Sequence, residues 1–356
     1  MMGDWYQTAC GIEGLADTGL DAVLVRRLES AATKAAASPI RFYLPSFKSF
    51  ETSEIASPPG ASWPAVSITG ADCRLQCDHC GARLLEGMIA ARTPEALRQV
   101  VERVAAAGAG GMLLTGGSDL NNEIDYTPFL PIVRRIKDRH PEFSIAVHTG
   151  LMDPARAKAL HASGVDVAMM DIIGAQDTVS RIYHLKRPVS DFEETLAALV
   201  DSGLRVVPHI VLGLHYGRLL GEWEALEMIA RHRTESAVLV AVMPHFVRPD
   251  RPFVTPDPEQ AGQFFADARR VLADRSLVLG CARPPGTAKV RMDTYAVMAG
   301  LDGIAHPSDG IVELARRLGR VHQVSTGCCS VEMSAPLTIA GAVPAPLVGG
   351  CGGGCS

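Results

Sequence analysis

The sequence predicts an α/β protein built on a TIM-like (βα)8 barrel or on a partial (βα)6-type barrel. From about residue 66 onward, short apolar runs alternate with amphipathic stretches, a cadence typical of parallel strands connected by helices. About eight such repeats fill roughly 240 residues, which is the size of one barrel of this kind. With 356 residues, of which 47% are hydrophobic, the chain can bury the large core that such a barrel needs.

Each predicted strand is a short apolar run bounded by turn residues. These runs lie at 67–70, 112–116, 144–148, 167–172, 205–214, 237–243, 276–281 and 303–305. Helical periods, with apolar residues at i, i+3 and i+4, cover 94–107, 190–202, 221–232 and 257–273. Because barrels of this type carry their chemistry at the C-terminal ends of the strands, we expect the functional residues there.

The segments on either side of the barrel differ from it in composition. Residues 1–65 form a predicted N-terminal helical extension, with a helix near 19–36 and a stretch over 39–65 that wraps the outside of the barrel. The barrel itself is assigned to residues 66–324. The last segment, 325–356, turns to Gly, Pro, Ala and Cys and ends in GGCGGGCS, a composition typical of a flexible tail.

Charge and hydropathy exclude several classes of partner. Lys and Arg number 34 against 39 Asp and Glu, a formal net charge of −5, so the chain has no basic footprint for nucleic acid. No run approaches the roughly 18 consecutive apolar residues of a membrane span. The N-terminus MMGDWYQTACGIEG also lacks a basic segment followed by an apolar one. We therefore expect a cytoplasmic protein that binds neither nucleic acid nor membrane.

Three of the nine cysteines follow the first predicted strand in the run ADCRLQCDHC. The spacing Cys73-x3-Cys77-x2-Cys80 places three thiolates on the first βα loop, where they can share one metal centre. A structural zinc ion would need a fourth protein ligand, for which His79 and the distant Cys281 are candidates. The alternative is a [4Fe–4S] cluster held at three irons, with the fourth iron open to a ligand that is not protein.

The motif CxxxCxΦC after the first strand of a parallel barrel resembles the signature of the radical SAM enzymes, with His79 at the aromatic position Φ. The resemblance implies that S-adenosylmethionine binds the open iron through its amino and carboxylate groups. It implies that the reduced cluster cleaves S-adenosylmethionine to a 5′-deoxyadenosyl radical, which abstracts hydrogen from an unactivated carbon. The protein would then supply position and exclude water, and no single catalytic side chain is identified.

Glycines and an aspartate match further positions of this family. Gly116 and Gly117, with Asp119 close behind, lie where the family has its GGE-type turn, whose backbone meets the methionine amino group. Glycine permits that close approach. Asp171 ends the fourth predicted strand, where relatives place a polar residue against ribose or methionine. Its alternative role is that of a helix N-cap.

Three more residues match the family in part. Arg187 lies where similar enzymes carry an arginine for the methionine carboxylate, and its alternative role is a solvated charge at a helix start. Ile210 and Gly213 match a GxIxGxxE motif that lines adenine, although no Glu ends it. The resemblance thus assigns S-adenosylmethionine binding to His79, Gly116, Gly117, Asp119, Asp171, Arg187, Ile210 and Gly213.

Over roughly residues 65–307 the order of motifs resembles the biotin synthase-related group, which includes archaeal-type two-component lipoyl synthases. The motifs are SITG, CDHC, LEGM, LLTGG, VHTGLMD, DIIG, IYHL, PHIVLGL and LGCARPPG. This resemblance implies sulfur insertion into a small-molecule or carrier-protein-bound substrate. It also implies an electron donor such as flavodoxin or ferredoxin, and a partner radical SAM subunit. Methylation, rearrangement or fragmentation during cofactor assembly is the alternative outcome.

A second sulfur-bearing centre is a further hypothesis. Cys281 and Arg283 end the seventh predicted strand, and His148 and His209 stand on the third and fifth strands where the related enzymes place cluster ligands. Both histidines are otherwise substrate contacts or core residues. The tail adds Cys328, Cys329, Cys351 and Cys355, which could hold a second iron–sulfur cluster, carry sulfur, or have no role. The competing class of function is a non-catalytic iron–sulfur or zinc scaffold.

Overall fold

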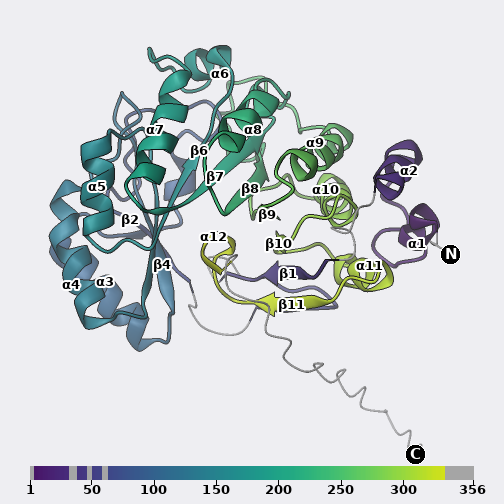
Figure 1. Ribbon diagram of the computed structural model, residues 1–356, viewed down its shortest axis with the longest axis horizontal. Coiled ribbons are helices and arrows are strands. Elements are labelled where there is room, and N and C mark those ends of the chain that lie inside the picture. The colour runs from purple at the N-terminus through teal and green to yellow at the C-terminus, as the bar shows by residue number, and fades with distance from the viewer. Residues whose placement is uncertain (1–3, 32–37, 46–49, 58–62, 333–356) are drawn as a thin grey trace, which may run out of the picture.

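The computed structural model describes residues 4–31, 38–45, 50–57 and 63–332, which form one curved parallel sheet with helices on its outer face (Figure 1). The strands are β1 (Ile40–Tyr43), β2 (Ala65–Ser67), β3 (Ile89–Ala90), β4 (Gly111–Thr115), β5 (Ser144–His148), β6 (Val167–Asp171), β7 (Arg205–Leu212), β8 (Ser236–Ala241), β9 (Ser276–Leu279), β10 (Gly303–Ala305) and β11 (His322–Ser325).

The strands follow the order β11-β1-β10-β9-β8-β7-β6-β5-β4-β2-β3, and every neighbouring pair in this order is parallel. Within the described residues β11 and β3 end the sheet without pairing to each other, so the barrel is partial. The predicted fold class is confirmed. All eight predicted strands are present, with ends shifted by a few residues.

The helices are α1 (Trp5–Cys10), α2 (Ala22–Ser30), α3 (Pro94–Ala106), α4 (Leu130–Arg139), α5 (Pro154–Ala162), α6 (Gln176–Arg181), α7 (Ser190–Asp201), α8 (Glu222–Ala230), α9 (Pro258–Val271), α10 (Thr287–Met298), α11 (Ile311–Arg317) and α12 (Cys329–Glu332). Local sequence explains several starts. Thr93, Asp153 and Asp257 each cap a helix through a side-chain oxygen, and each is followed by a proline, which suits the first helical turn.

The N-terminal segment only partly agrees with its expected place outside the barrel. Helices α1 and α2 do pack on the outer layer, against α9, α10 and α11. However, Ile40–Tyr43 forms β1, which pairs with β10 on one side and β11 on the other. Ile40 and Phe42 are completely buried, so burial of this apolar run draws it into the sheet. The boundary at residue 65 remains a prediction, and the sheet crosses it.

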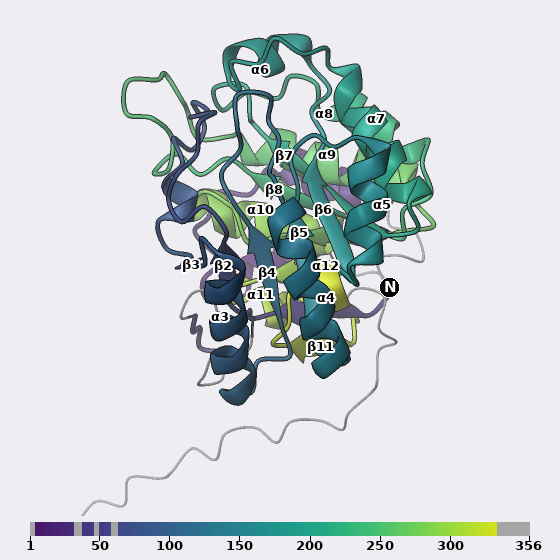
Figure 2. The same cartoon turned by 90° about the vertical axis from the view of Figure 1, so that its left-hand side faces the viewer.

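The interior of the curve holds its own small cluster of apolar side chains. The cluster comprises Tyr43, Trp63, Ala146, Val167, Met169, Val207, Val238, Val278, Ala305 and Cys329. Its last member belongs to α12, the short helix that lies inside the curve of the sheet and contacts β6, β8 and β10 (Figure 1). Figure 2 shows the loops that extend beyond one end of the strands, at the top of the view near α6. Among the described helices, none has the length and apolar character needed to cross a bilayer.

Candidate active site

The three cysteines lie on the loop that follows β2 at the C-terminal edge of the sheet. The Cys80 amide donates to the Cys77 carbonyl at 3.2 Å and folds the second half of the loop into a turn. The first half is tied to the loop after β4, where the Ser118 carbonyl accepts from the Arg74 amide at 2.8 Å and from the Cys73 thiol at 3.7 Å. Cys77 is buried, and Cys73 and Cys80 are half-buried.

The three thiols influence one another's ionisation. Burial, followed by the neighbouring Cys80 and Cys73, raises the pKa of the Cys77 thiol well above its usual range. Burial opposes ionisation of Cys80 as well, but the charge of His79 and a hydrogen bond from its ring lower the Cys80 pKa overall. A cationic centre bound by all three thiolates would relieve this mutual repulsion.

The arrangement of the thiols suits a multinuclear cluster. Among the residues that the structure describes, no three Cys, His, Asp or Glu side chains converge on one point that could hold a single metal ion. A [4Fe–4S] cluster makes no such demand, because each thiolate ligand binds a different iron atom. The residues of the loop therefore fit the cluster better than they fit zinc.

Gly116 and Gly117 directly follow β4 and lie against the cysteine loop. A Cβ atom on Gly117 would come within 1.9 Å of the Asp72 carbonyl oxygen and 2.6 Å of Cys73 Cα, so the close approach requires glycine. The Gly117 amide also donates to Thr69 Oγ1 at 2.7 Å. A Cβ on Gly116 would meet only side-chain atoms, the nearest at 3.0 Å. Contact of this turn with methionine remains a prediction.

Polar side chains stand next to one another at the ends of β5 and β6 and beside them on β7. Strand pairing sets Asp171 directly beside His209. Nε2 of His148 lies 3.5 Å from Oδ1 of Asp171, and the rings of His148 and His209 meet edge-on with centroids 5.5 Å apart. The residue two positions before each of the three belongs to the interior cluster, so all three side chains point into the barrel.

The pKa values of the two histidines shift in opposite directions. Burial would lower the pKa of His148, but the Asp171 carboxylate raises it overall. Burial and the adjacent His148 lower the pKa of His209 to about 4. His209 is therefore neutral at neutral pH, and its Nδ1 lies 3.0 Å from the Val207 carbonyl. With the proton on Nδ1, Nε2 remains as a hydrogen-bond acceptor inside the barrel.

Two aromatic side chains continue this row toward the cysteine loop. The ring of His79 packs on the ring of Tyr183 with centroids 5.1 Å apart. Burial would lower the pKa of His79, but Cys80 and then Asp171 raise it overall. In the described part of the chain, neither His79 Nδ1 nor the Tyr183 hydroxyl has a hydrogen-bond partner, although both atoms are buried. Buried polar atoms of this kind are suited to contact a bound ligand.

Two predicted S-adenosylmethionine contacts are engaged by neighbouring groups of the protein. Oδ1 of Asp119 accepts from the backbone amides of Asn121 and Glu123 at 2.8 and 2.9 Å. Arg187 pairs with Asp191 and lies 3.9 Å from the Glu123 carboxylate. The structure thus assigns both residues a role in loop geometry, and their contact with S-adenosylmethionine stays a prediction.

Ile210 lies on β7, and Gly213 lies in the turn that follows this strand. Ile210 is buried in the main core, and Gly213 has φ +74°, with Pro256 Cγ 2.5 Å from where a Cβ would lie. The Gly213 amide donates at 2.9 Å to Oε1 of Glu222, a buried carboxyl at the start of α8. Burial raises the pKa of Glu222 to about 7. Glu222 thus stabilises the turn from a position that the motif comparison did not identify.

A second group of thiols lies in the barrel interior. Cys329 is buried in the interior cluster, with Cys281 and Cys328 packed against it. The side-chain hydrogen bond with Cys328, then burial and Cys281, raises the pKa of Cys329 well above its usual range. The helix that carries Cys329 is held by Arg205, whose Nη2 donates to the Val331 carbonyl at 3.0 Å. Cys351 and Cys355 lie outside the described residues.

Arg283 and His148 have different neighbours. The Arg283 guanidinium is completely buried, ion-paired with Asp293 at 2.8 Å and hydrogen-bonded to the Ala305 and His306 carbonyls at 2.6 and 3.1 Å. It therefore joins strand ends to α10. Cys328 lies close enough to His148 to contribute to its raised pKa, so the thiol group borders the polar row.

Sequence reasoning missed three residues of this region. Tyr183 and Glu222 bring buried polar groups to the site. Asp78, inside the cysteine motif itself, is buried and ion-paired with two other loops. A charged residue between two predicted metal ligands was a signal for Asp78, whereas the other two depend on tertiary packing.

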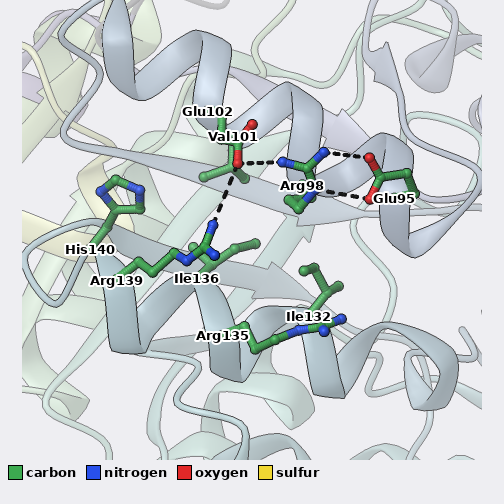
Figure 3. Close-up of a pocket in the computed structure, with 9 residues that line it drawn as sticks. All are labelled: Glu95, Arg98, Val101, Glu102, Ile132, Arg135, Ile136, Arg139 and His140. Atoms are coloured by element: carbon green, nitrogen blue, oxygen red, sulfur yellow. Dashed lines mark hydrogen bonds and ion pairs between the residues drawn. The ribbon is translucent and has the colours of Figure 1, made fainter.

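A surface hollow of about 200 Å³ between α3 and α4 lies on the outer layer of the barrel and is unrelated to this chemistry (Figure 3). Ion pairs along this hollow join Arg98 to Glu95 and Glu102 within α3, and Arg139 of α4 to Glu102. These side chains are largely exposed, as expected for a solvated helix surface.

Comparison with known proteins agrees with the fold. Residues 67–229 match the model of the radical SAM superfamily. Methylornithine synthase (PylB) is 13% identical with a TM-score of 0.53, covering 91% of this chain and 94% of that one. HydG, a maturase of the [FeFe]-hydrogenase, is 14% identical with a TM-score of 0.56, covering 94% and 77%. At these identities the likeness shows the fold alone. No curated protein matches the sequence.

Proposed function

Residues 67–229 form a radical SAM superfamily domain, and on that premise we propose that the protein is an enzyme that functionalises an unactivated carbon. The family implies a [4Fe–4S] cluster and S-adenosylmethionine, which together supply a 5′-deoxyadenosyl radical that abstracts hydrogen. The observation that supports the proposal is the packing of the cysteine loop. Its backbone lies directly against Gly117 at the strand ends, and His79 connects it to the polar row inside the barrel.

Different residues of the chain would have different roles in such a site. Cys73, Cys77 and Cys80 would hold the cluster, and Asp171 with His148 presents a charge pair to polar groups of a bound molecule. The barrel interior next to this pair is lined by apolar side chains, among them Met169. Helix α12 packs inside the curve of the sheet against these strands. Such a lining excludes water and so protects a reactive species from side reactions.

The first experiment measures iron binding and S-adenosylmethionine cleavage. Anaerobically reconstituted protein should be brown and, with dithionite, should release 5′-deoxyadenosine from S-adenosylmethionine. Cys77→Ala should lose both, because a buried thiolate ligand is removed. Cys10→Ala, on the outer helix α1, is the matched control and should keep both. Colourless, zinc-loaded wild-type protein that releases no deoxyadenosine would contradict the proposal and favour a scaffold.

We further propose sulfur insertion as the outcome, on a small molecule or on an acyl chain presented by a carrier protein. The support is the thiol group of Cys281, Cys328 and Cys329, which lies in the barrel interior next to the polar row. A flavodoxin or ferredoxin would deliver the electron, and a second radical SAM subunit would act as partner. Each of these is inferred from the resemblance to biotin and lipoyl synthases.

The sulfur proposal is tested by counting iron and sulfide in the full chain. A second cluster gives about eight irons per chain, and a single cluster gives about four. Cys329→Ala should lower the count by about half while deoxyadenosine release persists. About four irons in the wild type, unchanged in Cys329→Ala, would leave the radical chemistry intact and refute a second cluster at this place.

A further inference from the structure

Asp78 is a buried carboxylate in the middle of the cysteine motif, one residue after Cys77. Its side chain is completely excluded from solvent. Oδ1 lies 2.8 Å from His184 Nε2 and 3.0 Å from Arg251 Nε. A buried carboxylate is costly unless it is paired, so these two contacts stabilise a charge that solvent does not reach.

The contacts of Asp78 come from two different loops. His184 lies between α6 and α7, in the connection that follows β6 and is called here the loop after β6, and Arg251 lies in the loop after β8. The backbone repeats the pattern, because the Asp78 amide donates to the Ile182 carbonyl at 2.9 Å and its carbonyl accepts from the Arg248 amide at 2.9 Å. Side chain and main chain of one residue therefore join three loops at the mouth of the barrel.

Backbone strain marks the same junction. His184 has φ +57°, a left-handed conformation that is uncommon for residues other than glycine. Such conformations persist where surrounding contacts determine them, and here the contact is the hydrogen bond to Asp78. The adjacent Tyr183 carries the hydroxyl without a partner in the described residues, so the junction also sets the place of that side chain.

We propose that Asp78 is a positioning residue, which holds the cluster-binding loop against the loops after β6 and β8 and thereby fixes the cluster and Tyr183 relative to each other. This inference rests on the proposed cluster at Cys73, Cys77 and Cys80. Asp78 acts on the cluster through the loop and through its buried negative charge, and it is not itself a ligand. Changes in residues that orient metal ligands commonly weaken metal retention about tenfold to a hundredfold.

The test compares Asp78→Asn, Asp78→Ala and wild type in the full chain, with Asp250→Asn as the matched control. Asp250 also pairs with Arg251, and with the Arg248 side chain, but it is exposed. The measurements are the rate of iron loss to a chelator, the reduction potential of the cluster, and hydrogen exchange of the loops after β6 and β8 in protein without iron. Asp78→Asn should lose iron about tenfold faster than wild type.

These variants distinguish the effect of the negative charge of Asp78 from the effect of its hydrogen bonds to the neighbouring loops. Asp78→Asn keeps an acceptor for His184 but removes the charge, so the reduction potential should rise while hydrogen exchange changes little. Asp78→Ala should also increase exchange in both loops. If Asp78→Ala does not fold, Arg251→Gln leaves the carboxylate in place and should speed iron loss by itself.

Two results have distinct meanings. Wild-type protein that takes up no iron overturns the proposed function. Wild-type protein that loads iron, with Asp78→Asn and Asp78→Ala matching it in iron loss, potential and exchange, overturns the role of Asp78 and leaves the proposed function standing.

Discussion

Replacement of Gly117 by alanine is the most direct test of how the cysteine loop is positioned. The added methyl carbon would lie 1.9 Å from the Asp72 carbonyl oxygen and 2.6 Å from Cys73 Cα. These are backbone atoms, which cannot rotate away, so the loop itself must move. Overpacking of this kind costs about 1–3 kcal/mol, and contact with rigid backbone places Gly117→Ala at the upper end. We expect loss of most of the bound iron as well, because Cys73 is displaced.

Gly116→Ala is the matched control at the preceding position. Its methyl carbon would meet only side chains, with Ile68 Cγ1 at 3.0 Å, and these can adjust. The change in unfolding free energy should stay within about 1 kcal/mol. Urea denaturation of the iron-free protein and iron analysis after anaerobic reconstitution provide the two measurements. Equal iron content in both variants would refute the view that the bare Gly117 backbone positions Cys73.

Three further predictions concern buried polar groups. Glu222→Gln should flatten the pH dependence of stability between about pH 4.5 and 7, because a carboxyl whose pKa is raised to about 7 stabilises the fold only while protonated. Relative to Glu222→Gln, the wild type should lose roughly 3 kcal/mol of unfolding free energy as pH rises across that range in chemical denaturation, and equal pH slopes in the two proteins would contradict this. His209, with a pKa of about 4, contributes with the opposite sign, so relative to His209→Gln the wild type should lose stability as pH falls from about 6.5 to 4. Tyr183→Phe should leave iron-free stability within about 0.5 kcal/mol, since its hydroxyl has no partner in the described residues, and should raise the concentration of S-adenosylmethionine needed for cleavage.

The strands that carry the site were predictable because their apolar runs are continuous. A strand buried on both faces reads as such a run, and 144–148 and 303–305 were predicted with the observed ends. The cysteine loop could be recognised because its three cysteines lie within eight residues of one another, Cys73 to Cys80. Local sequence therefore identified the loop and the edge of the sheet on which it lies.

Long-range contacts were not predictable from the same patterns. The run IRFY at 40–43 looked like part of an outer segment, since its partners β10 and β11 lie more than 250 residues later in the sequence. Arg283 has the residue type of a ligand, yet it is buried in an ion pair with Asp293. Asp78 became informative only when the loops bearing His184 and Arg251 were seen to meet it.

The place of β1 between β10 and β11 also constrains the order in which the strands can pair during synthesis. Because synthesis runs from the N-terminus, Ile40–Tyr43 must wait for Gly303–Ala305 and His322–Ser325 before either of its hydrogen-bonded edges is satisfied. Pairings of such large sequence separation form late and slowly. Until then the nascent chain exposes an apolar segment, so the sheet is completed only after β10 and β11 have been synthesised.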